Sequence, residues 1–307
     1  RIELRYSPEI IKLEEFEQRV LQDIVSNPTK SFLIVLNTIN STKKLFEYLK
    51  SSGPTDTDYY YLSTNITPKE RLDRILKIKE GNNIRRKVII STQLIEAGVD
   101  IDVDIVYRDL APLDSINQVS GRCNRNYTEG KKGEVRIFSL SDGEIEYYKY
   151  IYPSFLIEKT REVLKGYDLI SEKEFLKLNN YYFQKVKMDQ SDHISKERLD
   201  DVKKMQFENL QKNFQLIEKT YEKTDVFIEL DDVAKKIWSE YTKICILPNP
   251  LERKKKFLGI RKEFSEYIIS IKTDAAPPIN LENGIAYVPC ENLTSFYDEN
   301  TGYKKGV

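Results

Sequence analysis

Histidine and cysteine are scarce in this sequence, and their scarcity excludes several kinds of catalytic site. The chain has a single histidine, His193, and its three cysteines lie far apart with no CxxC pair. Structural zinc sites need closely spaced cysteine and histidine ligands, and histidine-rich metal nuclease sites need several imidazoles. We therefore predict no metal site, and we interpret His193, in DQSDHISKE, as a solvated residue at a helix start. The cysteine usage suits a reducing compartment such as the cytoplasm.

Long apolar runs and an excess of charge are missing as well. No run approaches the roughly 20 apolar residues that a membrane-spanning helix needs, and no signal peptide opens the chain, so we expect no membrane association. Lys+Arg and Asp+Glu balance at 49 each, so any nucleic-acid site must be a local patch. The basic run Arg253–Lys256 could belong to such a patch, although a solvated face is the more common explanation. The first residue is Arg1 rather than methionine, which fits a fragment of a longer protein.

Strand-like and helix-like segments alternate between residues 31 and 140. Apolar runs that are typical of buried strands occur at 31–37, 59–63, 87–92, 104–110 and 135–140. A helix is predicted to begin where Thr67 and Glu70 form a capping box and Pro68 occupies the first helical position. Gly81 is predicted to end that helix. This alternation predicts an α/β domain with a parallel sheet and helices on both faces.

The texture of the sequence changes after about residue 145. The stretch 144–166 reads as helical with a break at Pro153, and 195–224 reads as one long amphipathic helix. We interpret the apolar stripe of that helix as packing: Leu199, Val202, Leu210, Phe214, Ile217 and Tyr221. The tail contains short strands and turns. We therefore predict a first domain at 1–165, a helical linker at 166–225 and a smaller mixed α+β accessory domain at 226–307.

Two of the predicted strands end in short polar side chains. Ligands of open parallel sheets bind outside the carboxyl ends of the strands, so these positions are candidates for binding. The stretch IVLNT ends in Asn37 and Thr38, and KVIIST ends in Thr92. Such groups can hydrogen-bond the phosphodiester backbone of a nucleic acid. Simple capping of the following loop explains Asn37 and Thr38 as well.

The loop after Thr92 carries a glycine and two acids. In STQLIEAGVDID, Gly98 follows a short helical turn, and Asp100 and Asp102 come next. An aspartate on this loop could accept hydrogen bonds from a ribose. Asp100 and Asp102 could equally be turn residues, and the sequence leaves both interpretations open.

The stretch INQVSGRCNR combines two arginines with a glycine and a glutamine. If it is helical, Gln118, Arg122 and Arg125 fall at i, i+4 and i+7 and share one face. Gly121 lies beside that face and would let a ligand or another backbone approach. Guanidinium groups stay charged and bind phosphate oxygens with paired hydrogen bonds. With no adjacent acid the arginines would repel each other unless an anion lay between them; the alternative is a surface helix with solvated arginines.

Taken together, these stretches resemble superfamily 2 helicases. IVLNT resembles motif IV, STQLIEAGVDID resembles motif V, and QVSGRCNR resembles motif VI, and they occur in that order. The longer string STQLIEAGVDIDVDIVYRDLAPLDSINQVSGRCNRN, at 91–126, closely resembles the CRISPR-associated helicase–nuclease of type I interference systems. The strong resemblance covers about residues 31–140 and implies a second RecA-like domain. The end of the chain resembles that family's C-terminal accessory domain loosely.

The sequence departs from the family pattern in several places. Ser63 and Thr64 follow the strand at 59–63, where such helicases often have a histidine. The sequence has no GxxxxGK[ST] phosphate loop, no DExH-type acidic box and no histidine–aspartate nuclease motif. The resemblance therefore implies that a first RecA-like domain outside this chain holds most of the ATP and Mg²⁺. A nuclease domain could be fused to that domain or be separate.

The resemblance also implies roles in nucleotide binding. Arg122 and Arg125 would reach the γ-phosphate of ATP, with Arg125 as the arginine finger. Gln118 would contact the phosphates or position the arginines. Residues of the neighbouring loop and helix end would line the nucleotide site, with the aspartate toward the ribose: Gly98, Asp100 and Gly121.

For nucleic acid, the resemblance implies that Thr92, together with Asn37 and Thr38, holds phosphates of single-stranded DNA. The whole protein would be an ATP-dependent DNA helicase that acts on DNA marked by a guide-RNA surveillance complex. The present chain alone would be inactive. Two alternatives stay open, namely a non-enzymatic helicase-like module that binds DNA or a protein, and a DNA-repair helicase of superfamily 2.

Overall fold

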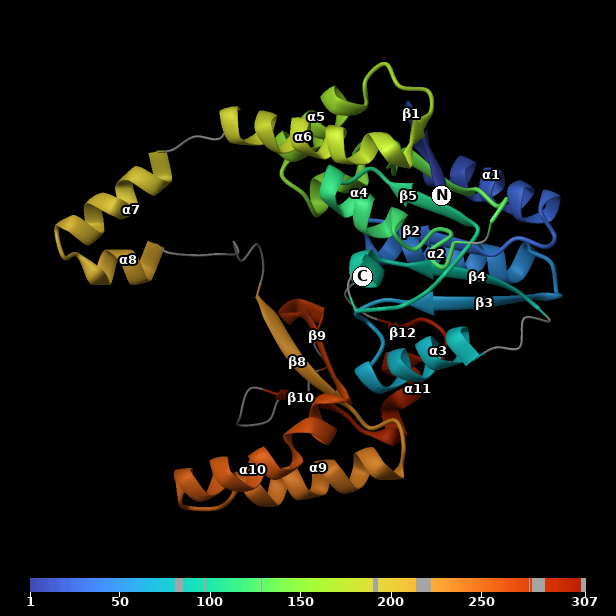
Figure 1. The fold of residues 1–307 in the computed structure, drawn as a ribbon. Helices are drawn as coiled ribbons and strands as arrows, with labels where there is room; N and C mark the ends of the chain where they lie inside the picture. Colours follow the sequence, from blue (N-terminus) through green and yellow to red (C-terminus); the bar gives the residue numbers. More distant parts are fainter. Residues whose placement is uncertain are drawn as a thin grey trace.

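The larger of two main sheets forms the body of the molecule (Figure 1). The computed structural model describes residues 1–80, 85–96, 98–127, 129–189, 193–213, 222–275, 277 and 285–304. The larger sheet has seven strands in the order β3-β4-β2-β5-β6-β1-β7. These strands are β1 (Ile2–Lys12), β2 (Phe32–Val35), β3 (Thr57–Leu62), β4 (Arg86–Ser91), β5 (Ile105–Asp109), β6 (Gly133–Ser141) and β7 (Ile170–Ser171). All neighbours are parallel except β1 and β7, so the predicted parallel sheet is confirmed.

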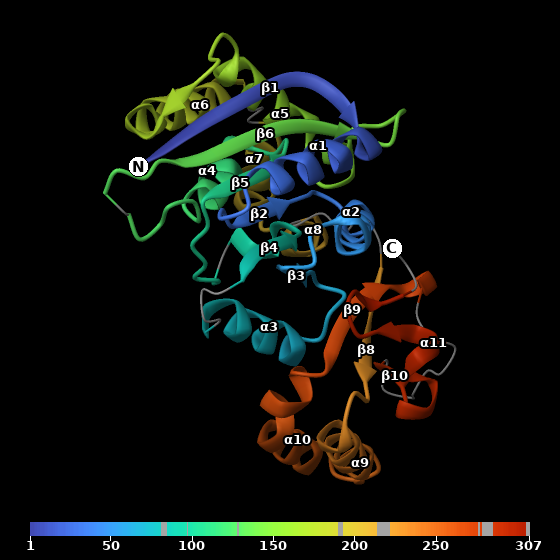
Figure 2. The ribbon, with the colours of Figure 1, turned by 90° about the vertical axis from the view of Figure 1, so that its right-hand side faces the viewer.

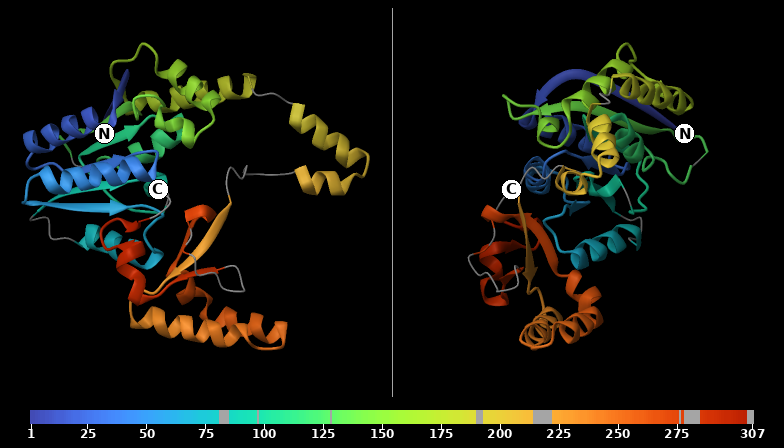
Figure 3. Two further views of the ribbon diagram at one scale, coloured as in Figure 1. Left: turned by 180° about the vertical axis from the view of Figure 1, so that it is seen from behind. Right: turned by 90° about the vertical axis from the view of Figure 1, so that its left-hand side faces the viewer.

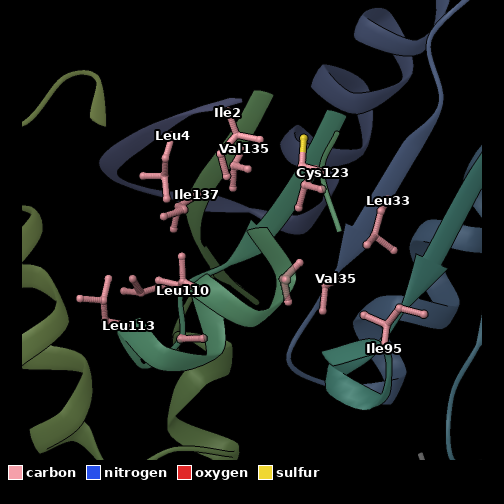
Figure 4. Packing of buried hydrophobic residues seen from close by; sticks show 14 of the residues in the cluster. Ile2, Leu4, Leu33, Val35, Ile95, Leu110, Leu113, Cys123, Val135 and Ile137 are labelled. Atoms are coloured by element: carbon pink, nitrogen blue, oxygen red, sulfur yellow. The ribbon is translucent and has the colours of Figure 1, made fainter. Parts of the chain in front are cut away.

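Helices cover both faces of this sheet, as Figure 2 shows. On one face α1 (Leu13–Ser26) and α2 (Ile39–Ser52) bury Phe16 and Leu45. The opposite face carries α3 (Pro68–Glu80), α4 (Leu113–Ser120), α5 (Ser154–Leu164) and α6 (Phe175–Asp189). Figure 4 shows the packing on this second face, where aliphatic side chains from β1, β2 and β6 meet those at the start of α4. Strand β2 is buried along its whole length, which explains its continuous apolar run.

Strand β1 is an addition to the predicted sheet. It runs parallel to β6 and pairs with β7 at Glu3 and Leu4. Its register with β6 shifts between Tyr6 and Ile10, and Pro8 lies within this irregularity. Proline has no N–H and argues against a central strand when only the sequence is considered. The irregularity places Pro8 where the ladder is interrupted, so the strand continues past it.

The range 166–225, predicted as a helical linker, divides into two kinds of structure. Strand β7 and helix α6 pack against the larger sheet, and Leu178 and Tyr182 of α6 are buried in its core. Helices α7 (His193–Lys203) and α8 (Phe207–Asn213) instead stand away from both sheets, as Figures 1 and 3 show. The boundaries of the domains stay a prediction.

The single long helix predicted at 195–224 is wrong. The chain breaks between α7 and α8, where Met205 has a φ of +55°. A residue in this left-handed conformation ends a helix. Leu199 and Val202 are 58% and 47% exposed, so their part of the apolar stripe does not pack. The rest of the predicted helix includes residues that lie outside the described ones: Phe214, Ile217 and Tyr221.

The second sheet has three strands in the order β10-β8-β9, formed by β8 (Lys223–Ile228), β9 (Ile268–Lys272) and β10 (Ile285–Val288). Helices α9 (Asp232–Cys245) and α10 (Pro250–Ser265) pack on one face around Trp238 and Phe264. The other face meets α11 (Leu293–Phe296) and a two-stranded pair, β11 (Tyr297–Asp298) and β12 (Gly302–Tyr303). The predicted small mixed α+β part is confirmed. In the described parts of the chain, no helix is both long and apolar enough to span a membrane.

The two sheets are joined through the loop that precedes α3. The Tyr297 hydroxyl accepts a hydrogen bond from the backbone N–H of Thr67 at 3.0 Å and donates one to the Glu70 carboxylate. The Glu70 N–H donates to the Thr67 hydroxyl at 3.4 Å. Tyr297 therefore completes the predicted capping box, because its hydroxyl bridges the Thr67 N–H and the Glu70 carboxylate, the two groups that would bond directly in the usual box. The predicted last residue of this helix, Gly81, lies outside the described residues.

A second set of contacts at this joint involves β12. The Tyr303 N–H donates to the Asn65 carbonyl oxygen at 2.9 Å. Arg74 of α3 donates to the carbonyl oxygens of Asn300 and Glu299, each at 2.6 Å. Gly302 has a φ of +79°, and a Cβ placed there would lie 2.3 Å from the Asn65 carbonyl oxygen. The close approach of the two backbones therefore requires glycine.

Replacing Gly302 with alanine is expected to lower the free energy of unfolding by about 2 kcal/mol or more, because the new Cβ meets backbone and the left-handed φ is unfavourable. Chemical denaturation measures the loss. The matched control is Gly259→Ala, since Gly259 lies within α10 and a Cβ placed there would meet no other part of the fold within 4 Å. That substitution should instead stabilise the chain by up to about 1 kcal/mol. Equal effects of the two substitutions would contradict the role assigned to Gly302.

Candidate nucleotide and DNA site

The predicted site residues fall into two groups at different ends of the sheet layer. Asn37 and Thr92 follow the carboxyl ends of β2 and β4. The turn that holds Arg122 lies at the other end of α4, where Cys123 forms a bridge with Val103 just before β5 begins. The predicted DNA contacts and the predicted nucleotide contacts are therefore separated, with α4 and the loop after β4 between them.

The loop after β4 is anchored by its short 3₁₀ helix η1 (Gln93–Glu96). Ile95 of η1 is fully buried and lies below Val35 of β2 in Figure 4. Thr92 is 4% exposed, and its N–H donates to the Leu62 carbonyl oxygen of β3 at 3.2 Å. Gly98 has a φ of +74°, a left-handed conformation that favours glycine. The loop is thus held at its start and turns sharply before the two aspartates.

Helix α4 does not extend through the arginines, so the predicted shared helical face is wrong. The helix ends at Ser120, with Gly121 as its C-cap. The chain then turns, Asn124 adopts a φ of +45°, and Cys123 is buried against β6. Burial raises the pKa of the Cys123 thiol to about 12, so this cysteine is a neutral packing residue. Its burial and its bridge with Val103 pull the chain out of the helix.

The two arginines have different surroundings. Arg125 is on the surface, and its Nε lies 2.7 Å from Asp100 Oδ1, with side chains 41% and 66% exposed. Arg122 is 9% exposed, and its Nη2 donates to the Glu96 carbonyl oxygen at 2.8 Å. Burial lowers the pKa of Arg122, the positive charge of Arg125 lowers it further, and Asp100 opposes both effects. The expectation that no acid lies beside the arginines is wrong, because the loop after β4 brings Asp100 to them.

The acids of this loop have distinct contacts. Asp102 accepts hydrogen bonds from the backbone N–H groups of Arg125 at 2.8 Å and Asn126 at 3.1 Å, so it stabilises the arginine turn. The sequence left open whether Asp102 is a turn residue or a ribose ligand, and these hydrogen bonds make it a turn residue. Asp100 pairs with Arg125, and its contact with a ribose stays a prediction. Gln118 is exposed in the last turn of α4, and Gly121 is the residue that follows the helix.

A polar cavity of about 440 Å³ opens beside these acids. Its lining combines carboxylate, amide and ammonium groups, including Asp100, Asp102, Asn126, Lys79 and Lys131. Its volume lies within the range of ligand pockets, although its lining is more polar than is usual for them. Among the described residues, no group of histidine, cysteine, aspartate and glutamate side chains is arranged to hold a metal ion.

Asn37 belongs to a buried network that sequence reasoning missed. Its Oδ1 accepts a hydrogen bond from Arg108 Nη1 at 2.7 Å, and its Nδ2 donates to the Leu110 carbonyl oxygen at 2.8 Å. Arg108 is fully buried, and its Nη2 lies 2.9 Å from Glu96 Oε1. Thr38 accepts from the Ser41 N–H at 3.1 Å and caps α2. The DNA contacts of Asn37 and Thr38 stay predictions, and the structure gives both residues a local role.

The signal for this network was present in the strand DIVYRDL. Two charged residues, Arg108 and Asp109, interrupt a run that the parallel sheet buries on both faces. Charged groups are buried only when they are paired. Burial raises the pKa of the Asp109 carboxyl to about 7, against the lowering effects of Arg108 and of backbone N–H groups including Leu140. Two charged residues within a buried strand therefore indicate a polar network around them.

The part of the chain that carries both arginines and η1 resembles a known family. Residues 28–128 match the family described as CRISPR-associated nuclease/helicase Cas3, C-terminal. This segment is a Cas3-like C-terminal domain. The Cas3-like domain contains β2 to β5, α4 and the arginine turn, so it includes every predicted site residue.

Curated relatives are similar to part of the chain. The CRISPR-associated nuclease/helicase Cas3 of Methanothermobacter thermautotrophicus is 31% identical over 144 residues, which is 46% of this chain and 17% of the relative. The protein of the same description from Haloferax volcanii is 55% identical over 100 residues, or 31% of this chain and 11% of the relative. The aligned part of the chain spans less than a fifth of these relatives' length.

Solved structures share the fold over nearly the whole chain. The crystal structure of T. fusca Cas3 with ATP has a TM-score of 0.60 and 16% sequence identity, and the match covers 94% of this chain and 39% of that one. A structure described as a pre-nicking CRISPR RNA-guided surveillance complex has a TM-score of 0.60 and 15% identity, and the match covers 94% of this chain and 41% of that one. The similarity of fold therefore extends beyond the residues that the family match covers.

Proposed function

We propose that this chain is the C-terminal part of an ATP-dependent DNA helicase of type I CRISPR interference. In this proposal it supplies an arginine finger to ATP hydrolysis and contacts to single-stranded DNA. The observation that carries the proposal is that Arg122 and Arg125 lie on one turn of a Cas3-like domain, next to a polar cavity. The sequence itself contains no phosphate loop, so ATP and Mg²⁺ would be bound mainly by a facing RecA-like domain.

The contacts of Arg125 suit the role of arginine finger. Asp100 holds its Nε, so the two Nη groups would be the ones that bind an incoming phosphoryl group. The ion pair is exposed, and exposed pairs are worth about 1 kcal/mol or less, so the guanidinium can change partners. Arg122 is fixed by the Glu96 carbonyl. In the transition state the two positive charges would meet the charge that develops on the γ-phosphoryl oxygens.

The DNA side of the proposal rests on the other end of the sheet layer. Thr92 directly follows β4 and is held to β3 by its backbone N–H, so its hydroxyl would bind phosphate from a fixed position. ATP-driven closure against the facing domain would then move single-stranded DNA. The structural relatives include Cas3 with ATP and a guide-RNA surveillance complex, and we propose the same nucleotide and the same kind of partner for the complete protein.

The isolated chain provides a direct test. It should hydrolyse no ATP above the buffer rate, with or without single-stranded DNA, because the phosphate loop is on another domain. Phosphate release measured over hours gives the result. Turnover by the isolated chain would contradict the proposal. A complete protein that binds DNA but never hydrolyses ATP would favour the non-enzymatic binding module instead.

A further inference from the structure

Arg108 lies at the centre of a buried polar network that none of the predicted motif roles uses. It is fully buried in β5. Its Nη2 group lies 2.9 Å from Glu96 Oε1, from Ser115 Oγ and from Tyr152 Oη. Its Nη1 group donates to Asn37 Oδ1 at 2.7 Å. One guanidinium thus connects the end of β2, the turn η1, the start of α4 and the segment before α5.

The geometry of this network is better suited to holding its side chains at set positions than to raising the stability of the fold. Burying an ion pair costs about as much desolvation as the attraction returns, so an apolar core would serve stability equally well. A guanidinium has a rigid planar fork, and its several partners must all sit at set positions. Ser115 strengthens the arrangement, because its hydroxyl also donates to Glu96 Oε1 at 2.7 Å. The Glu96 side chain is therefore held by two donors from two different elements.

Glu96 links this network to the arginine turn. Its carboxylate binds Arg108, and its backbone carbonyl oxygen accepts from Arg122 Nη2 at 2.8 Å. The Nε of Arg122 is buried and has no hydrogen-bond partner in the described part of the chain. The direction of the Arg122 guanidinium therefore depends on where η1 places one carbonyl group. Ile95 anchors η1 by packing in the core, and Arg108 holds Glu96, the last residue of η1, by charge and hydrogen bonds.

We propose that Arg108 is a positioning residue for Arg122, acting through Glu96 and η1. The inference rests on the proposed function, because it assumes that Arg122 contacts a phosphoryl group of ATP. Arg108 itself touches no substrate, since it is enclosed by protein. Its contribution is the placement of the Arg122 guanidinium before the nucleotide arrives. Such preorganisation acts on the transition state, so it should affect kcat more than KM.

Arg108→Lys in the complete protein tests the proposal. Lysine keeps the charge against Glu96, but one ammonium group cannot satisfy all the partners of the guanidinium fork. We expect kcat for ATP to fall roughly 10- to 100-fold, with KM within about twofold. Ser115→Ala removes one hydrogen bond to Arg108 and one to Glu96 and keeps the ion pair between them. It should give a smaller loss of kcat, and it replaces the lysine variant as the test if that variant does not fold. The control is Arg136→Lys. Arg136 lies on neighbouring β6 and forms a partly exposed ion pair with Asp23 of α1, and this variant should leave kcat unchanged.

A double-mutant cycle separates positioning from a purely structural role. In an Arg122→Ala background, measured by single-turnover hydrolysis, Arg108→Lys should cause no further loss, because the residue that it positions is gone. If the same fold-loss of kcat appears with and without Arg122, or if folded Arg108→Lys and Ser115→Ala proteins both keep the wild-type kcat, the positioning role is wrong. If Arg122→Ala and Arg125→Ala themselves leave hydrolysis unchanged, the proposed function fails and not merely this inference.

Discussion

Replacing Arg125 with alanine in the complete protein is expected to reduce ATP hydrolysis by roughly 10³- to 10⁵-fold, as for other arginine fingers. That loss corresponds to about 4–7 kcal/mol of activation free energy. The reason is electrostatic, since the guanidinium meets charge that develops only as the phosphoryl group is transferred. ATP affinity should change little, because the facing domain would hold most of the nucleotide. Phosphate release at saturating ATP and DNA, together with equilibrium nucleotide binding, measures the two quantities separately.

The matched control for this prediction is Arg85→Ala. Arg85 also lies on the surface of the same domain in an exposed ion pair, with its Nε 3.3 Å from Asp58 Oδ1, and its other hydrogen bonds go to the carbonyl oxygens of Thr55 and Asp56 beside β3. We expect this variant to hydrolyse ATP at the wild-type rate. If Arg125→Ala keeps a rate near that of the wild type, Arg125 is not the finger. If both variants lose activity equally, a general loss of surface charge is the better explanation.

Replacing Arg108 with methionine is expected to lower the free energy of unfolding by about 3–5 kcal/mol. The substitution leaves Glu96 with its carboxylate 13% exposed and without its charge partner, and breaking a buried ion pair from one side has this cost. The amide oxygen of Asn37 and the hydroxyl oxygen of Tyr152 would each lose a hydrogen-bond donor as well. Equilibrium denaturation of the 307-residue chain measures this loss without any nucleotide.

Two companion variants define the origin of that loss. Arg85→Met removes an exposed arginine beside β4, where the side chain is 50% exposed beside Asp58, so we expect a loss of no more than about 1 kcal/mol. The double variant Arg108→Met with Glu96→Leu removes both charges and should be more stable than the sum of the single losses by at least about 1 kcal/mol. Strict additivity would show that the two side chains do not interact, contrary to their 2.9 Å separation.

The contrast between the two arginines of the turn has a physical basis. Arg122 is nearly buried and bound to a backbone carbonyl, so its direction is set before any ligand binds. Arg125 is exposed and paired with one acid, so it can exchange that acid for a phosphate. A fixed cation beside an exchangeable one suits a site that must bind and release a nucleotide in each cycle.

Much of the fold was predictable because its signals are local. The strands at 31–140 are short apolar runs, and the start of α3 is marked by Thr67, Pro68 and Glu70. Each of these signals depends on neighbours within a few positions along the chain. The family resemblance was equally local, because the stretch 91–126 contains the loop after β4 and the arginine turn together.

The candidate site was predictable in its members but not in its geometry. The sequence pattern at 118–125 fits a helix, yet α4 ends at Ser120 because Cys123 is buried and bridges to Val103. Asp100 stands 25 positions before Arg125, and only the turn of the loop at Gly98 brings them together. A residue's neighbours along the chain say little about such pairs.

What the sequence determined by itself was the set of elements, the presence of an arginine pair and the resemblance to superfamily 2 helicases. What only the tertiary structure decided was the pairing of distant parts. Strand β1 passes Pro8 because an irregular register with β6 accommodates it. Arg108 becomes the centre of a network because β2, η1 and α4 each bring it a partner. Propensities and motifs act over a few residues, whereas these contacts depend on which segments the folded sheet places side by side.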